Sequence, residues 1–331
     1  MPRTEKASLE IIIPVFNEEE VLPTLLTRLR KVFSASAIQQ EGLSSVVFLF
    51  VDDGSKDRSA ETLAREIEAG NPFVLYRFSR NFGHQAAVSA GIAHSRADLV
   101  AIIDADLQDP PEVILEMVKV WRQGYDVVYG VRKKRKEGLL KRFCYASYYR
   151  LLQFLSDTEV AMDSGDFALM DRRVVAALQA LPERVRYPRG LRSWVGFKQT
   201  GFPYERDGRE MGVSKYSWRK LYQLATEGII STSTRPLKLT QWTASLFLVF
   251  MLIFSGLILS RLVLREKYDK STLMFLVLCL LISVTGLVIM GALHILCGYV
   301  ARMYLEIKGR PTYLVKEVIG QSQYSSERNV A

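Results

Sequence analysis

Two long apolar runs near the end of the chain constrain its fold more than any other feature. Residues 242–264 carry a single charge, Arg261, and residues 273–300 carry no charged side chain apart from a histidine, His294. Roughly 20 consecutive apolar residues cross the core of a bilayer, whereas helices of soluble proteins alternate polar and apolar faces. The two runs therefore predict transmembrane helices. Residues 265–270 would join them into a hairpin, so that both chain ends face the same side.

The charge and hydropathy of the chain indicate which kinds of molecule it is expected to bind. A net charge of +9 and a mean hydropathy of +0.07 favour an anionic membrane, nucleic acid or a phosphate-bearing substrate. The three cysteines, Cys144, Cys279 and Cys297, lack CxxC spacing and indicate neither a zinc site nor a disulfide framework. The apolar run near the amino terminus is too short for a signal peptide. Basic residues flank both the outer ends and the link of the hairpin, so charge alone leaves its orientation open.

The part of the chain before the hairpin alternates short apolar runs with helical patterns. Apolar strands without polar alternation, separated by helices, favour a parallel sheet that is covered on both faces. The fold class is therefore α/β. The strand candidates are residues 9–14, 46–51, 74–78 and 99–103, and the helix candidates are residues 19–32, 59–68 and 84–93.

Polar and acidic residues follow each strand candidate, most densely in the stretch DADLQD after residue 103. In parallel sheets ligands bind beyond the carboxyl ends of the strands. No glycine-rich phosphate loop follows a strand, and carboxylates at such an edge suit Mg²⁺ or Mn²⁺. Asp104 and Asp106 are two residues apart, which in extended backbone points both side chains the same way. Asp109, before two prolines, is expected to cap the next helix instead.

An ordered set of segments then identifies a family. IIIPVFNEEE, FVDDGSKDRS, FSRNFGHQAAVSAGI and IIDADLQDPPE, in this order, resemble the catalytic domain of family 2 glycosyltransferases, which has a Rossmann-like GT-A fold with a mostly parallel sheet. SGDFALMDRR, GVSKYSWRKL and the hairpin are most similar to the polyprenyl-phosphate branch, which includes bactoprenol glucosyltransferases and dolichol-phosphate mannose synthases. The resemblance implies a GT-A domain over residues 1–234. A membrane domain with a short cytoplasmic tail would occupy residues 235–331.

The resemblance also implies which residues bind the donor. Asp106 and Gln108, with Asp104, should hold the divalent metal that bridges a nucleoside diphosphate. Such a metal neutralises the charge that grows on the leaving group. The residues expected to bind the nucleotide sugar are Pro14, Phe16, Glu18, Asp53, Asp104 and Ala105, with Asp53 at the base or ribose.

The acceptor side is expected to be basic. Most lysines of the run at residues 130–142 fit a solvated face or a membrane-surface patch, and Arg132 resembles a substrate-phosphate arginine of the family. A loop over residues 204–216 resembles the family's phosphate-binding loop, with a solvated loop as the alternative. Residues 217–232 fit either an amphipathic membrane-surface helix or an ordinary packing helix. The residues expected to bind the acceptor phosphate are Arg132, Arg206, Arg209, Ser214 and Lys215.

Asp163 and Asp166 lie where the family resemblance implies a catalytic carboxylate. A sugar hydroxyl needs a base before it can attack, but a phosphate monoester has a second pKa of about 6 and is already mostly a dianion near pH 7. We therefore expect Asp166 to position the sugar or the basic cluster rather than to abstract a proton.

Together these features predict an inverting glycosyltransferase that moves a hexose, with glucose from UDP-glucose expected, onto undecaprenyl phosphate or another polyprenyl phosphate. The alternatives are a different donor sugar (mannose, galactose or N-acetylhexosamine) or a processive polysaccharide synthase, although the QxxRW motif of such synthases is absent. Nucleic acid is not an expected partner, because no aromatics are interleaved with the basic run. A multi-pass protein of the plasma membrane with a cytoplasmic domain and termini is expected. The sequence leaves homo-oligomer formation open.

Overall fold

The computed structural model describes residue 3 and residues 6–132, 164–184, 186–205, 249, 252–253 and 270–320. The first apolar run lies almost wholly outside these residues, so the two-helix hairpin stays a prediction. The predicted amphipathic helix and the domain boundary near residue 235 also lie outside them.

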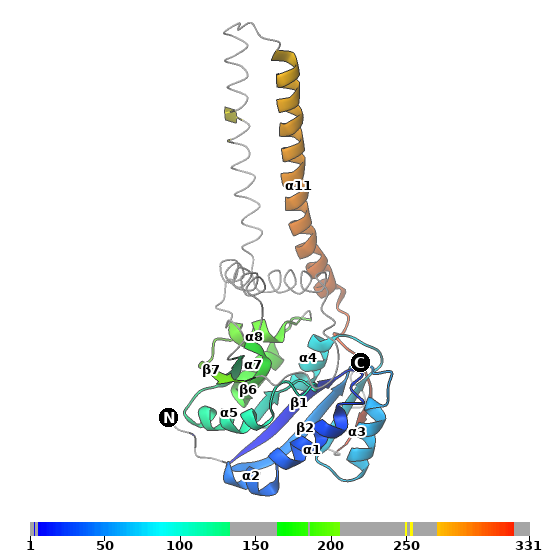
Figure 1. Ribbon diagram of the computed structural model, residues 1–331, viewed down its shortest axis with the longest axis vertical. Helices are drawn as coiled ribbons and strands as arrows, with labels where there is room; N and C mark the ends of the chain where they lie inside the picture. Colours follow the sequence, from blue (N-terminus) through cyan, green and yellow to red (C-terminus); the bar gives the residue numbers. More distant parts are fainter. Residues whose placement is uncertain are drawn as a thin grey trace.

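The described strands form one mixed sheet with the order β7-β5-β6-β4-β1-β2-β3-β8 (Figure 1). The central strands β4, β1, β2 and β3 are parallel, which confirms the mostly parallel sheet, and β6 runs antiparallel to both β4 and β5. The strands are β1 (Ala7–Val15), β2 (Leu43–Asp52), β3 (Phe73–Phe78), β4 (Leu99–Ile102), β5 (Val127–Arg132), β6 (Ser164–Asp171), β7 (Gln199–Tyr204) and β8 (Val315–Ile319).

Helices cover both faces of this sheet because the strands are apolar on both sides. Alternate side chains of β1 point to opposite faces. Ile11 and Ile13 pack in the core on one face, and Ile12 packs with α4 and α7 in the core on the other. The described helices are α1 (Leu22–Val32), α2 (Ala35–Gln40), α3 (Ser59–Glu68), α4 (His84–His94), α5 (Glu112–Arg122), α7 (Arg172–Ala180), α8 (Pro188–Trp194) and α11 (Lys270–Lys308).

Helix α4 lies unusually close to β1. Gly91 faces Ile12, and a Cβ atom at Gly91 would lie 2.3 Å from Cγ2 of Ile12. Real Cβ contacts do not come this close, so the absent side chain at Gly91 sets the distance between helix and strand. The position of α4 matters for the site because its first residue, His84, lies at the carboxyl edge of the sheet.

Helix α11 extends away from the α/β domain (Figure 1). Its 39 residues correspond to about 58 Å at about 1.5 Å per residue. An 18-residue window within Val284–Lys308 has a mean hydropathy of 1.9, and none of that window is buried by the rest of the protein. This helix is therefore long and apolar enough to cross a membrane.

The chain returns to the sheet after α11. The sequence predicts a tail here, but β8 pairs antiparallel with β3 and forms one edge of the sheet. Tyr313 stacks on Phe78 with ring centroids 5.0 Å apart, and Thr312 Oγ1 donates to the carbonyl of Arg184 at 2.8 Å. The segment after α11 is therefore part of the α/β domain.

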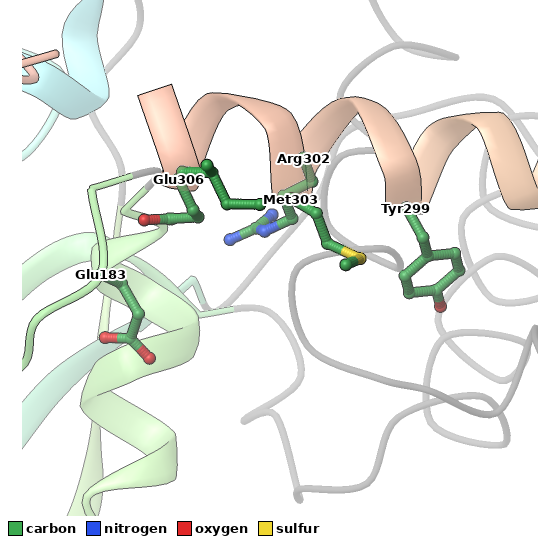
Figure 2. Close-up of a pocket in the computed structure, with 6 residues that line it drawn as sticks. Glu183, Tyr299, Arg302, Met303 and Glu306 are labelled. Carbon is green, nitrogen blue, oxygen red and sulfur yellow. The ribbon is translucent and has the colours of Figure 1, made fainter. Parts of the chain in front are cut away.

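A hollow of about 380 Å³ separates the last turns of α11 from the segment at Glu183 (Figure 2). Tyr299, Arg302, Met303 and Glu306 face it from the helix. The backbone N–H of Arg184 donates to the Glu306 carboxylate at 3.0 Å. The end of α11 is thus hydrogen-bonded directly to the α/β domain.

Candidate functional site

The loops after β1 and β2 are tied together at the carboxyl edge of the sheet. Asn17 adopts a left-handed backbone (φ 56°), its N–H donates to Ser55 Oγ, and its side-chain oxygen accepts from the N–H of Lys56. Phe16 is 42% exposed beside this junction, whereas Pro14 is buried within β1. Of the two expected nucleotide-binding residues Pro14 and Phe16, Phe16, just after β1, is therefore the one more open to a ligand.

Asp53 anchors the loop that follows β3. Its carboxylate accepts hydrogen bonds from the backbone N–H groups of Phe82 at 2.6 Å and Gly83 at 2.9 Å. Burial raises the pKa of Asp53, although these two hydrogen bonds oppose the change. The carboxylate thus holds the loop that leads into α4, while its expected contact with the nucleotide stays a prediction.

The stretch after β4 alternates in burial as the residue spacing predicts. Asp104, Asp106 and Gln108 are half-buried, and Ala105 and Leu107 between them are buried. The three polar side chains therefore emerge on one side. The backbone N–H of Gln108 donates to Asp106 Oδ1 at 3.2 Å, which fixes the turn.

The chemistry of this side fits a divalent cation. Asp104 Oδ1 is a buried acceptor for which the described residues provide no hydrogen-bond donor. Burial raises the pKa of Asp104 to about 6, although the nearby His84 opposes the shift. A bound cation would relieve this cost, and carboxylate and amide oxygens are the ligands that Mg²⁺ and Mn²⁺ prefer. Within the described residues, no three His, Cys, Asp or Glu side chains already form a metal-binding group.

The capping role expected for Asp109 is wrong. Helix α5 begins at Glu112 with Pro111 at the N-cap, and no side chain caps it. The two prolines move the helix start past Asp109, and the buried Asp109 carboxylate instead accepts a hydrogen bond from the hydroxyl of Tyr204. Burial and the charge of Asp109 raise the pKa of Tyr204, so this hydroxyl stays a donor.

Arg132, the last residue of β5, lies beside this pair. Burial alone would lower the pKa of Arg132. The hydrogen bond with Tyr204 and the carboxylates of Asp109 and Asp104 outweigh burial and raise that pKa. Its expected contact with the acceptor phosphate stays a prediction. The other residues expected to bind the acceptor phosphate, Arg206, Arg209, Ser214 and Lys215, and the expected catalytic carboxylate Asp163 lie outside the described residues.

Asp166, on β6, lies at the centre of a charged cluster. Its Oδ2 atom accepts from His84 Nε2 at 3.3 Å, Gln85 Nε2 at 3.4 Å and Arg189 Nη2 at 3.3 Å. Burial would raise the pKa of Asp166, but Arg189, the hydrogen bond from His84 and the charge of Arg192 hold it well below its usual range. A carboxylate in this state is a weak base, because an efficient general base has a pKa near the working pH.

His84 joins this cluster to the acidic stretch. Its Nε2 atom lies 3.3 Å from Asp166 Oδ2 and 3.7 Å from Asp104 Oδ1, and its side chain is 43% exposed. Burial opposes protonation, but the hydrogen bond to Asp166 and the charge of Asp104 raise the pKa of His84 to about 9. His84 is therefore a cation between two carboxylates at neutral pH.

Sequence reasoning missed four members of the cluster. His84 and Gln85 fall within the NFGHQAA segment, which carries the family resemblance but gives them no chemical role. Arg189 and Arg192 come from α8 and reach the site only because that helix packs against β6 and α4. Arg192 is buried and donates to the carbonyl of Gly165 at 3.3 Å. Nothing in the local sequence around α8 indicates this placement.

Comparison with known proteins places the chain in a family. Residues 10–178 match the glycosyl transferase family 2 model. The chain is 41% identical to the uncharacterized glycosyltransferase YkcC of Bacillus subtilis (strain 168), over 94% of each chain. It is 36% identical to the SfII prophage-derived bactoprenol glucosyl transferase of Shigella flexneri, over 93% of this chain and 97% of that one. A solved Pyrobaculum calidifontis mannosyltransferase, in complex with GDP-Man and Mn²⁺, is 14% identical with a TM-score of 0.48, over 93% of this chain and 89% of that one.

The matched residues include most of the α/β sheet and its acidic carboxyl edge, and the chain is thus a glycosyltransferase. The chain belongs to glycosyl transferase family 2. Its resemblance to the branch that includes the bactoprenol glucosyl transferases is confirmed along nearly the whole chain.

Proposed function

We propose that this enzyme transfers a hexose, glucose from UDP-glucose, with inversion to a polyprenyl phosphate, undecaprenyl phosphate in particular. The observation that carries this proposal is the 36% identity, over 93% of the chain, to enzymes named bactoprenol glucosyl transferases. The products would be a polyprenyl-phosphate sugar and a nucleoside diphosphate.

The acidic edge of the sheet supports a nucleoside-diphosphate donor. Asp104, Asp106 and Gln108 would hold Mg²⁺ or Mn²⁺ there, and such an ion supplies the positive charge that stabilises a diphosphate leaving group. Phe16 and Glu18 would line the nucleotide pocket, with Pro14, Asp53 and Ala105 shaping its floor.

The low pKa of Asp166 supports the proposal that the acceptor is a phosphate. A sugar-hydroxyl acceptor would need a base, but the arginines and His84 keep the pKa of Asp166 low. A phosphate monoester is already mostly a dianion near pH 7, since its second pKa is about 6. Asp166 would then orient its neighbours, and Arg132 and the basic loop after β7 would bind the acceptor phosphate.

The topology of the sheet supports a hairpin in the membrane. Because β3 and β8 are neighbours in one sheet, the chain between them must cross a bilayer an even number of times. If α11 crosses once, a second crossing is needed between β7 and α11, and residues 242–264 have the composition for it. Nucleotide sugars are cytosolic, so we place the α/β domain and both termini in the cytoplasm.

A donor screen tests the proposal. The full-length protein in detergent is incubated with undecaprenyl phosphate, Mg²⁺ or Mn²⁺ and one radiolabelled nucleotide sugar at a time, and lipid-linked label is counted. We expect label from UDP-glucose in excess of label from UDP-galactose, UDP-N-acetylglucosamine and GDP-mannose. If only another nucleotide sugar gives label, that sugar takes the place of glucose in the proposal. If the label is found in long polymers, the proposed single transfer is wrong and the enzyme is a polysaccharide synthase.

A further inference from the structure

Three side chains of the cluster at His84 each carry a buried acceptor oxygen that has no donor among the described residues. Within the described part of the chain, Asp104 Oδ1, Gln85 Oε1 and Asp166 Oδ1 have no hydrogen-bond partner. A buried acceptor without a donor is destabilising, so such atoms are rare in folded proteins and need an explanation. A cation at the acidic edge would account for Asp104 but leaves the other two oxygens.

The hydrogen bonds that Asp166 does make are long. All three donors to its Oδ2 atom lie at 3.3–3.4 Å, whereas such bonds are most often about 2.9 Å long. The Asp166 side chain is only 8% exposed, so its loose bonds are not a surface effect. Hydrogen bonds in ligand-free active sites are often long and tighten when the ligand binds. The cluster therefore has the character of a binding site for a group that donates hydrogen bonds.

Sugar hydroxyls are such donors, and the acceptor phosphate is not. A phosphate dianion carries no hydrogen-bond donor and would be repelled by Asp104 and Asp166. The transferred sugar is bonded to the diphosphate, which the acidic edge at Asp106 would bind. His84 Nε2 lies 3.7 Å from Asp104 and 3.3 Å from Asp166, so the cluster adjoins that edge.

We propose that Asp166 Oδ1, Gln85 Oε1 and the imidazole of His84 form the subsite that binds the hydroxyl groups of the transferred sugar. Arg189 and Arg192 hold the Asp166 carboxylate from α8 and leave its second oxygen for the ligand. Gln85 is then a specificity-determining residue, because its amide oxygen accepts from one hydroxyl while its nitrogen donates to Asp166. This inference rests on the proposed function, since it assumes a hexose donor.

The test compares UDP-glucose with its 3-, 4- and 6-deoxy analogues as donors, using the full-length enzyme and undecaprenyl phosphate. The native enzyme is expected to discriminate against at least one analogue by about tenfold or more in kcat/KM, the loss of one buried hydrogen bond. In Gln85→Met, the ratio of kcat/KM for UDP-glucose to kcat/KM for that analogue should fall close to one. The matched control is Gln123→Met, a change at an exposed glutamine after α5, and it should keep the native ratio.

The two ideas can fail separately. If UDP-glucose gives no transfer, the proposed donor is wrong, and the comparison is made with the donor that the screen selects and its deoxy analogues. If Gln85→Met lowers kcat/KM by one common factor for every donor, the subsite is overturned. If Gln85→Met does not bind UDP, His84→Ala decides instead, because His84 is 43% exposed and its replacement leaves the core intact. A ratio unchanged in His84→Ala would equally overturn the subsite.

Discussion

Replacing Gly91 by alanine should force α4 away from β1. The new Cβ would lie 2.3 Å from Ile12 Cγ2, and the next nearest atoms, at 3.0 and 3.1 Å, also belong to Ile12. Overpacking of this kind costs about 1–3 kcal/mol, and the better helix propensity of alanine offsets about 1 kcal/mol of it. The net loss in the free energy of unfolding should therefore be about 0–2 kcal/mol.

A double substitution isolates the contact. Ile12→Ala alone should cost about 2–5 kcal/mol, because it leaves a cavity in a fully buried core. In the double variant the methyl group introduced by Gly91→Ala enters the vacated space, so both the clash and part of the cavity disappear. The double variant should therefore be more stable than the sum of the single changes predicts, by about 1–3 kcal/mol.

Denaturant unfolding of the full-length protein in detergent measures this coupling. Ile11→Ala combined with Gly91→Ala is the matched control, since Ile11 packs on the opposite face of the sheet and its effect should be additive. If the Ile12 and Gly91 changes also add to within about 0.5 kcal/mol, the close contact between α4 and β1 does not set the helix position.

Four further changes test the site and the sheet. Asp106→Ala should abolish transfer, as should excess chelator with the native enzyme, and activity that survives chelation would contradict the metal assignment. Asp166→Asn should retain far more activity than Asp106→Asn, with a pH–rate profile that still rises near the acceptor's second pKa of about 6; equal losses with both substrates still bound would make Asp166 the base. Tyr204→Phe should lower the free energy of unfolding by about 1–3 kcal/mol, because Asp109 loses its hydroxyl donor; an unchanged midpoint in denaturant would refute this. A chain ending after Gly309 should unfold at lower denaturant than one ending after Gly320, which keeps β8; equal midpoints would mean that β8 adds no stability.

The sequence predicts the parallel half of the sheet well because each of its strands is a continuous apolar run. β1 to β4 and the helices α1 and α4 lie close to the predicted ranges, and α3 coincides with its prediction, whereas the short helix α2 is not predicted. The other strands are harder to predict. β7 is half-buried and mixed in character, and β8 pairs with a strand more than two hundred residues earlier. No local pattern encodes a pairing of that kind.

The site, like the sheet, has one part that the local sequence predicts and another that depends on contacts between distant elements. The spacing of two residues predicts the shared burial of Asp104 and Asp106, although the backbone there is a turn, with Leu107 in the left-handed region (φ 59°), and not the expected extended strand. The contacts of Asp166 with α8 and of Asp109 with Tyr204 depend on how distant elements pack. Sequence reasoning therefore finds the acidic edge but gives Asp109 the wrong partner and misses the arginines behind Asp166.

The position of β8 sets the order in which the newly made chain can finish folding. The outer edge of β3 leaves the ribosome early, and its pairing partner is made only after the whole of α11. Until then an unpaired strand edge is open to other chains, which is a known aggregation hazard. The sheet therefore closes only on a chain in which the whole apolar helix α11 has already been synthesised. A chain that stalls before β8 is made keeps an open sheet edge, which is the kind of surface that chaperones and proteases recognise.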